Sequence, residues 1–232
     1  MYENLIKEQY TFADLKEIIA ALRSEQGCPW DRVQTHESLK SCIKEEAYEV
    51  IEAIDELPGD LEASHLKEEL GDVLLQVMMH SQIASEERRF SVEDVIQGVA
   101  EKMVSRHPHV FGSVTADSAE AALDTWEKSK EKEKGKSADP IEEMERVARA
   151  LPALVRCQKV IKKSGVSLER KLAAERLLKD VQKAGADPKE EQIGQLLLDV
   201  VHLSTANGIS SEEALIQATE NLIAEAKQER QK

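Results

Sequence analysis

Two short acidic motifs hold the residues of this chain that are best able to do chemistry. Glu45, Glu46 and Glu49 stand in one run, and Glu69 and Asp72 stand three positions apart in another. In a helix that turns about 100° per residue, carboxylates three positions apart lie on one face, about one turn from each other. Each motif therefore offers a pair of carboxylates that point the same way.

The apolar residues around both motifs repeat with helical spacing. They are Leu39, Ile43, Ala47, Val50, Ile51 and Ile54 around the first motif, and Leu66, Leu70, Val73, Leu74, Val77 and Met78 around the second. On both predicted helices the acids fall on the same side of the apolar stripe. If the stripes pack on each other, Glu46, Glu49, Glu69 and Asp72 converge at the rim of the interface.

Four carboxylates in one place repel one another unless cations lie between them. Hard oxygen ligands select Mg²⁺ or Mn²⁺ over zinc, and Mg²⁺ keeps coordination positions open for phosphate oxygens. The competing interpretation is a solvated helix face, which is the commoner explanation for either pair alone. Gly71 favours function for the second pair, because glycine inside a helix costs roughly 0.5–1 kcal/mol relative to alanine and needs a packing or approach reason. Together the motifs predict a site for Mg²⁺, with Mn²⁺ as the alternative, and phosphate.

Composition favours an all-α fold. Of the 232 residues 41% are hydrophobic and only 3% aromatic, and good helix formers such as Ala, Leu, Glu and Lys abound. The net charge of −14 argues against binding to duplex nucleic acid. No secretory signal or apolar stretch of membrane-spanning length is present, so we expect a cytoplasmic protein. Three dispersed cysteines without a CxxC pattern suggest neither disulfides nor a zinc site.

Periodicity and capping signals predict a bundle of helices in each half of the chain. The expected helices cover about 11–25, 38–56, 61–85, 91–106, 119–130, 151–163, 168–183, 190–205 and 210–228. A charged segment without apolar residues separates the halves and indicates a linker. We therefore divide the chain into an N-terminal catalytic domain, 1–130, a linker, 131–148, and a C-terminal domain, 149–232.

The two halves are similar to each other in sequence, which indicates an internal duplication. Leu70-Gly71-Asp72 corresponds to Ile193-Gly194-Gln195, and similar Ser-containing helix starts follow both. The second copy is degenerate, because Gln192 and Gln195 stand where the first has acids, and amides supply no negative charge for Mg²⁺. We expect that half to be structural, dimerising or regulatory.

Several segments, taken together, resemble the MazG family of nucleoside triphosphate pyrophosphohydrolases, over about residues 14–163. The resemblance rests on Gly27-Cys28-Pro29-Trp30-Asp31-x-x-Gln34-Thr35, Glu45-Glu46-x-x-Glu49, Glu69-Leu70-Gly71-Asp72, Arg106-His107-Pro108-His109-Val110-Phe111 and Leu151-Pro152-Ala153-Leu154. It implies an all-α NTP pyrophosphatase fold, a homodimer, and Mg²⁺-dependent cleavage of nucleoside triphosphates to monophosphate and pyrophosphate.

The resemblance also implies roles for individual residues. Glu46, Glu49, Glu69 and Asp72 would be the metal ligands, and Glu45 would orient or deprotonate the attacking water. The residues that would contact substrate are Lys102, Arg106, Trp126, Lys130 and Trp30.

Each substrate contact has a simpler alternative. Lys102 and Arg106 could complement a helix C-terminus, Trp126 could anchor a core, and Trp30 could hold its loop in place. The single Glu62-x-x-His65 does not make a di-iron bundle, which needs two such motifs, and places His65 beside the acidic residues.

A second class of function remains open, namely a non-catalytic dimeric helical module that senses nucleotide or binds a partner. The retention of an intact acidic set beside a degenerate one favours the enzyme. The enzyme and the sensor both predict stabilisation by Mg²⁺ and nucleotide, whereas a purely structural adaptor predicts none.

Overall fold

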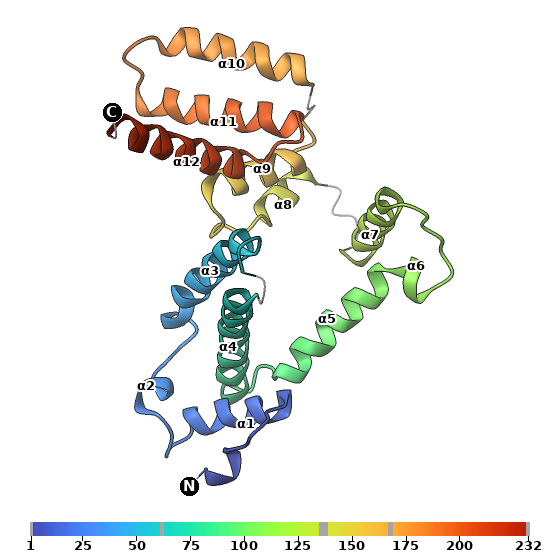
Figure 1. Ribbon diagram of the computed structural model, residues 1–232. Coiled ribbons are helices and arrows are strands. Elements are labelled where there is room, and N and C mark those ends of the chain that lie inside the picture. The colour runs from blue at the N-terminus through green and yellow to red at the C-terminus, as the bar shows by residue number, and fades with distance from the viewer. Residues whose placement is uncertain (1, 61–62, 135–138, 167–168, 231–232) are drawn as a thin grey trace. The chain divides into compact units, whose positions relative to one another are not determined.

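The computed structural model describes residues 2–60, 63–134, 139–166 and 169–230, and within them every regular element is helical (Figure 1). The prediction of an all-α fold is confirmed. The chain forms two compact units, Met1–Ser129 and Lys130–Lys232. No helix in the described ranges is long and apolar enough to cross a bilayer.

The N-terminal unit contains the helices that carry both acidic motifs. Its longer helices are α1 (Phe12–Arg23), α3 (Cys42–Glu56), α4 (Ser64–Glu86) and α5 (Val92–Arg106), followed by α7 (Ala119–Lys134), which continues past the boundary between the units. Its shorter turns are η1 (Glu3–Leu5), α2 (Pro29–Arg32), η2 (Ser38–Lys40) and α6 (Pro108–Phe111). The third predicted helix begins at Ser64, and residues 61 and 62, Glu62 included, lie outside the described residues.

Two predicted helix starts are fixed by reciprocal side-chain hydrogen bonds. At α1, the side chain of Thr11 accepts from the backbone of Asp14 while the Asp14 carboxylate accepts from the backbone of Thr11. Ser91 and Asp94 form the same capping box at α5. Both boxes satisfy backbone N–H groups that a helix leaves without partners, which explains why these ends are readable from sequence.

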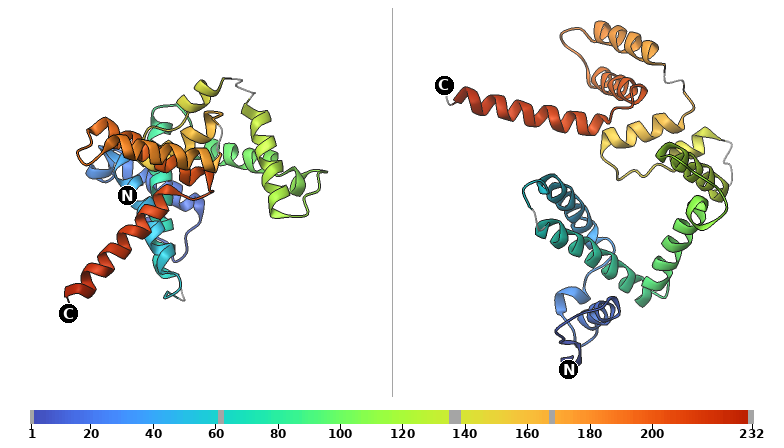
Figure 2. Two further views of the ribbon diagram at one scale, coloured as in Figure 1. Left: turned by 90° about the horizontal axis from the view of Figure 1, so that it is seen from above. Right: turned by 45° about the vertical axis from the view of Figure 1, so that its right-hand side comes forward.

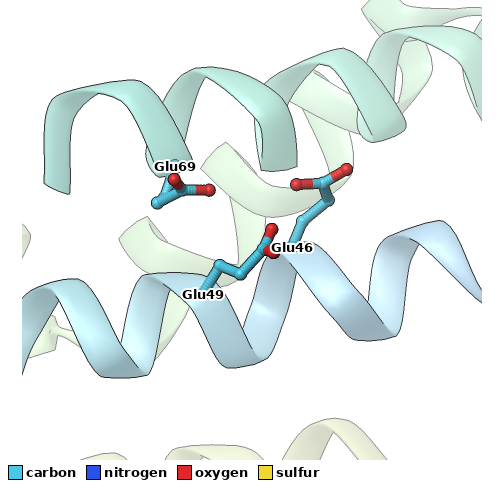
Figure 3. A group of neighbouring side chains, drawn as sticks. All are labelled: Glu46, Glu49 and Glu69. Atoms are coloured by element: carbon cyan, nitrogen blue, oxygen red, sulfur yellow. The ribbon is translucent and has the colours of Figure 1, made fainter. Parts of the chain in front are cut away.

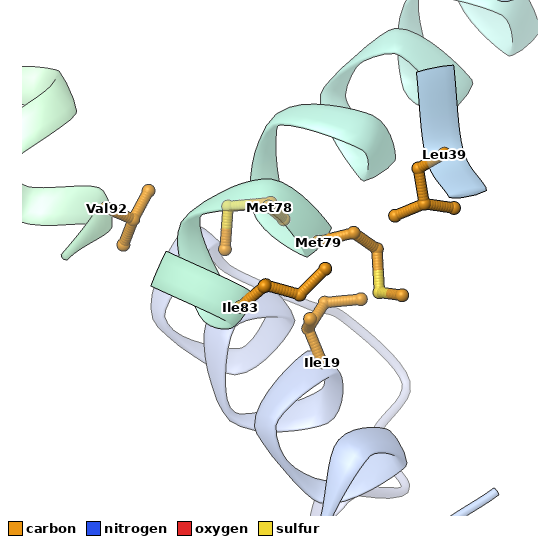
Figure 4. Packing of buried hydrophobic residues seen from close by; sticks show 6 residues of the cluster. All are labelled: Ile19, Leu39, Met78, Met79, Ile83 and Val92. Carbon is orange, nitrogen blue, oxygen red and sulfur yellow. The ribbon is translucent and has the colours of Figure 1, made fainter. Parts of the chain in front are cut away.

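The core of this unit joins α1 and η2 to the second half of α4 and the first residue of α5. Its buried members are Ile19, Leu39, Met78, Met79, Ile83 and Val92 (Figure 4). At the edge of this core the Arg23 guanidinium binds the Glu86 carboxylate, with Nη2 2.7 Å from Oε2, and so ties α1 to α4. α3 packs along the first half of α4.

Part of the apolar stripe of α4 is left uncovered by the described residues. Leu70 is 51% exposed and Leu74 is 39% exposed. α5 packs on α4 near its own start and then runs away from it (Figures 1 and 2), so the two helices do not close a bundle within one chain. Ile96 and Val99 of α5 are consequently 45% and 48% exposed.

The C-terminal unit is built around a helix hairpin. Its elements are α8 (Pro140–Glu145), α9 (Ala153–Lys163), α10 (Arg170–Ala184), α11 (Glu190–Ala206) and α12 (Ser211–Arg230). α10 and α11 form the hairpin, and α9 packs on α11 and α12. α8 lies within residues 131–148, the predicted linker, and packs on α9, while α7 extends into the same segment from the other side.

Candidate active site

The helix pair α3–α4 places the two acidic motifs against each other. Glu46 and Glu49 point from α3 toward Glu69 on α4 (Figure 3). One carboxylate oxygen from each of these three residues lies within 4.8 Å of the other two. Packing of the apolar stripes thus brings acids from distant parts of the sequence to one place, as the spacing of the motifs predicts.

Asp72, the fourth predicted ligand, lies outside this group of three but within electrostatic reach of it. Burial raises the pKa of the Glu46 carboxyl above its usual range, and the negative charge of Asp72 raises it further, followed by contributions from Glu49 and Glu69. A raised carboxyl pKa is the expected result of crowding acids without a cation between them. The cluster is therefore a site at which positive charge would be stabilising.

The chemistry and size of the cluster fit a hard divalent cation. All its ligand atoms are carboxylate oxygens, which Mg²⁺ and Mn²⁺ prefer. Oxygens on opposite sides of a Mg²⁺ ion lie about 4.2 Å apart, at about 2.1 Å each from the ion. The separations of up to 4.8 Å between Glu46, Glu49 and Glu69 need only small side-chain adjustments to reach this geometry.

His65 adds a contact to the cluster that the sequence analysis did not predict. Its Nε2 lies 3.2 Å from Oε1 of Glu69, and its Nδ1 lies 2.7 Å from Oε2 of Glu56. The hydrogen bond with Glu56 raises the pKa of the imidazole, and the charge of Glu69 adds to this effect. The one available signal was spacing, because His65 stands four residues before Glu69 on one helix face.

Gly71 lies in α4 between Leu70 and Asp72. A Cβ built on Gly71 would meet no atom within 4 Å, so packing inside the described chain does not account for a glycine here. The other reason for a glycine at this position is close approach by a group from outside the chain, and this stays a prediction.

Glu45 lies in the first turn of α3 and is exposed. It is not part of the group formed by Glu46, Glu49 and Glu69. Its predicted role toward the attacking water stays a prediction, because this role depends on a substrate.

Two of the predicted substrate-binding residues, Arg106 and Trp126, contact each other. The Arg106 guanidinium lies 5.5 Å from the centre of the Trp126 ring, a cation–π geometry that joins α5 to α7. Lys102 is exposed one turn before Arg106, and Lys130 follows one turn after Trp126. Beyond its first residues α5, which carries Lys102 and Arg106, diverges from α4 (Figure 1).

Trp30 lies on α2 and is 62% exposed, and the hydrogen bonds that hold its loop come from another residue. That function belongs to Arg23, whose Nη1 donates to the backbone oxygens of Asp31 at 2.5 Å and Gln34 at 3.1 Å. The Trp30 ring stays accessible for a ligand, and its role in binding substrate stays a prediction.

Gln192 and Gln195, the glutamines that the predicted duplication aligns with Glu69 and Asp72, form hydrogen bonds within the α10–α11 hairpin. Gln195 Nε2 donates to Oδ1 of Asp199 at 3.0 Å, and Gln192 Nε2 donates to the backbone oxygen of Lys183 at 3.2 Å. The Gln195 bond lies within α11, and the Gln192 bond joins α11 to the end of α10. The structural role expected for this half stays a prediction.

The segment that carries both acidic motifs also matches a known family. The profile of the MazG nucleotide pyrophosphohydrolase domain matches residues 34–111, which include α3, α4 and α5. Over 221 residues the chain is 43% identical to the nucleoside triphosphate pyrophosphohydrolase/pyrophosphatase MazG of Thermotoga maritima, covering 91% of this chain and 82% of that protein. This chain belongs to the MazG family.

Two other relatives also match most of this chain. The nucleoside triphosphate pyrophosphohydrolase of Escherichia coli K12 is 34% identical over 209 residues, covering 84% of this chain and 78% of the relative. The uncharacterized protein YabN of Bacillus subtilis is 46% identical over 161 residues, which are 68% of this chain but only 32% of the relative. The MazG-type region therefore also occurs within a considerably longer protein.

Proposed function

We propose that this MazG-family protein hydrolyses nucleoside and deoxynucleoside triphosphates to the monophosphate and pyrophosphate, with Mg²⁺ held by Glu46, Glu49, Glu69 and Asp72. The observation that carries the proposal is the convergence of oxygens from Glu46, Glu49 and Glu69 within 4.8 Å of one another. Mn²⁺ would serve in the same place, since it takes the same oxygen ligands. The names of the Thermotoga and Escherichia relatives support the reaction.

The reaction needs positioning and charge neutralisation more than covalent chemistry from the protein. When bound, Mg²⁺ neutralises charge on the phosphate oxygens and orients them. Glu45, next to Glu46 in the sequence, would orient the water or accept its proton. The water oxygen forms a bond to the α-phosphorus, the bond from that phosphorus to the bridging oxygen breaks, and pyrophosphate leaves.

The cationic and aromatic residues of α5 and α7 are proposed to bind the rest of the substrate. Lys102 and Arg106 would contact phosphate oxygens, and Lys130 would add a third cation. Trp126 and Trp30 offer flat faces for the base. The contact between Arg106 and the Trp126 ring supports this proposal, because it gives both side chains a defined orientation.

We further propose that the protein is a homodimer formed through the exposed apolar side of α4 and α5. Leu70, Leu74, Ile96, Val99 and Met103 are between 39% and 51% exposed, an unusual amount of apolar surface for helices this long. A second copy covering this side would remove it from water. It would also bring its own α5, with Lys102 and Arg106, to this side of the molecule.

The test is to identify the products formed from a panel of nucleoside triphosphates with Mg²⁺. The proposal expects monophosphate and pyrophosphate, not diphosphate and phosphate. Glu49→Gln and Asp72→Asn should lose at least about a hundredfold in rate while staying folded, because each removes charge at the metal. Asp55→Asn, on the same helix as Glu49 but away from the cluster, should keep the native rate.

Three outcomes would contradict the proposed enzymatic activity. They are no turnover by the native protein, other products, or full activity of both site variants. Mg²⁺-dependent nucleotide binding without turnover would instead support the alternative, a non-catalytic module that senses nucleotide.

A further inference from the structure

Gln76 on α4 is almost fully buried, yet its amide oxygen has no hydrogen-bond partner. The residue is 6% exposed, and within the part of the chain that the structure describes no donor reaches Oε1. Nearly all buried polar atoms in folded proteins are hydrogen-bonded, so an acceptor of this kind needs an explanation. A donor supplied by a bound molecule is the explanation that the surroundings of Gln76 favour.

Gln76 lies on the same helix face as two of the proposed metal ligands. At about 100° per residue it projects about 20° from Glu69 and about 40° from Asp72. It stands one turn beyond Asp72, and Met78 and Met79, which follow it, belong to the hydrophobic core. Gln76 therefore lies where the acidic face of α4 meets the core.

The register of α3 against α4 places Gln76 opposite the first turn of α3. Nδ1 of His65 lies 2.7 Å from Oε2 of Glu56, and the carboxylates of the cluster face each other further along the two helices (Figure 3). Because the helices run in opposite directions, eleven residues, about three turns, lead from this pair to Gln76 on α4 and back to Glu45 on α3. Glu45 is exposed and Gln76 is buried, so the two side chains approach the cluster from its solvent side and from its core side.

The C-terminal unit has a buried polar residue at the position that the predicted duplication aligns with Gln76. This residue is Asp199, which is 1% exposed. Nε2 of Gln195 donates to its Oδ1 at 3.0 Å, and Nε of Arg176 lies 2.9 Å from the same oxygen. There the chain itself supplies donors to the buried side chain, whereas beside the acidic cluster it supplies none to Oε1 of Gln76.

The chemistry of the proposed site indicates water as the missing donor. An amide oxygen only accepts hydrogen bonds, so it does not bind the oxygens of a triphosphate, which are acceptors too. Water is a donor that hydrolysis itself requires. A glutamine amide orients the attacking water in nucleotide hydrolases of other folds, because it holds the water without taking its proton.

We propose that Gln76, together with Glu45, orients the water that attacks the α-phosphorus, an inference that rests on the proposed hydrolysis. The water would donate one O–H to Oε1 of Gln76 and the other to the Glu45 carboxylate, which leaves a lone pair of its oxygen directed at phosphorus. As the new bond from this oxygen to phosphorus forms, Glu45 takes the proton and the bond from phosphorus to the bridging oxygen breaks. The electron pair of that bond leaves with pyrophosphate, and the Gln76 amide neither gains nor loses a proton.

The test is to replace Gln76 by methionine, which has a similar length and no amide. At saturating Mg²⁺, Gln76→Met should lower kcat for a nucleoside triphosphate about a hundredfold and leave KM within about threefold, because the water loses its orientation while the substrate keeps its contacts. In EDTA the same variant should unfold about 2 °C or more above the native protein, because the buried acceptor without a donor is gone. A residue with a purely structural role would lose stability together with rate.

Gln82→Met is the matched control. Gln82 lies on the same helix, but its Nε2 donates to Oε1 of Glu86 at 2.9 Å, so its amide already has a partner. Gln82→Met should keep the native kcat and gain no stability. Gln76→Asn keeps the amide but withdraws it by one CH₂ group, and it should lower kcat as Gln76→Met does. This variant decides the matter if Gln76→Met fails to fold.

Four results would overturn the role of Gln76. Two are a native kcat in folded Gln76→Met or Gln76→Asn, and a loss of rate that is accompanied by a lower unfolding temperature. A raised KM at native kcat would assign the amide to the nucleotide, and weaker binding of Mn²⁺ would assign it to the metal. Absence of hydrolysis by the native protein would refute the proposed function and this role with it, whereas native hydrolysis with unchanged kcat in the folded variants would refute only the role of Gln76.

Discussion

The imidazole Nε2 of His65 lies 3.2 Å from a carboxylate oxygen of Glu69, one turn further along α4. The other ring nitrogen is held by Glu56, at 2.7 Å. Glu56 belongs to the end of α3, so the imidazole links the two helices that carry the acidic cluster. Outer partners of this kind fix the orientation of a metal-binding carboxylate and are as much part of a site as the ligands.

Replacing His65 should therefore weaken the metal site without removing a ligand. His65→Gln is expected to raise the Mg²⁺ concentration for half-maximal activity about tenfold to a hundredfold. A Mg²⁺ titration of the hydrolysis rate measures this. His36→Gln is the control, since both histidine side chains are 37% exposed and His36 lies away from the cluster. An unchanged Mg²⁺ requirement in His65→Gln would show that the imidazole does not position Glu69.

Glu45 should matter for the chemical step and not for metal binding. Glu45→Gln is expected to lower kcat about 10²-fold to 10⁴-fold, the usual contribution of a positioned acid or base. The same protein should bind Mg²⁺ as the native does, because Glu45 is not among the three converging carboxylates. Rate measurements at saturating Mg²⁺, paired with a metal titration, separate the two effects. A loss of metal affinity in place of rate would make Glu45 a ligand.

Glu46 should destabilise the metal-free fold. Burial and the charges of Asp72 and Glu49 raise its pKa, so the folded state holds its proton more tightly than the unfolded state does. The protonated carboxyl of Glu46 therefore contributes fully to folding stability below its ordinary pKa of about 4.5, and this contribution is lost as pH rises through the raised pKa. In EDTA at pH 7, Glu46→Gln should therefore unfold at a higher temperature than the native protein.

With Mg²⁺ added, the native protein should unfold at a higher temperature than Glu46→Gln. The native protein gains stability by binding the ion, whereas Glu46→Gln gains little. The unfolding temperatures of the native protein and of Glu46→Gln, each measured with EDTA and with Mg²⁺, are the four values to compare. A Glu46→Gln variant that is less stable than the native protein in EDTA would contradict the argument from repulsion.

The exposed apolar side of α5 should join two copies of the chain. Val99→Glu places a charge in the middle of this surface, where Val99 is 48% exposed, and should produce a monomer. Gln97→Glu introduces the same side chain on the other side of the same helix and should leave the native assembly intact. Light scattering coupled to size-exclusion chromatography measures both masses. A native monomer, or an unchanged mass in Val99→Glu, would exclude this surface as the contact.

The sequence predicts the long helices of this protein well because their signals are local. The capping boxes at Thr11 and Ser91 and the helical spacing of apolar residues are short-range patterns that do not depend on the rest of the fold. The single-turn helices α2 and α6 were not predicted, since four residues are too few to show a period. α8 was missed because it lies in a strongly charged segment.

The sequence does not predict which element covers an apolar helix face, because this depends on the path of distant parts of the chain. The stripe that contains Leu70 and Leu74 has the periodicity of a buried face, but the path of α5 leaves it partly open. For the site, the spacing of the motifs predicts the approach of Glu46, Glu49 and Glu69 that the structure has. The contacts His65–Glu69 and Arg106–Trp126 were not predicted. The spacing of His65 and Glu69 puts them on one helix face but does not show that they meet, and no pattern in the sequence pairs Arg106 with Trp126.

The central claim, that the cluster of α3 and α4 binds a divalent cation, is tested most directly by titrating the protein with Mn²⁺ and measuring free Mn²⁺ by electron paramagnetic resonance. Three proteins are compared: the native chain, Glu69→Gln, and Glu68→Gln, which removes the same charge from the neighbouring, exposed position of α4. We predict that the native chain and Glu68→Gln bind Mn²⁺ alike and that Glu69→Gln binds at least about tenfold more weakly. Equal binding by Glu69→Gln and Glu68→Gln, or no binding by the native chain, would contradict the assignment of the metal site.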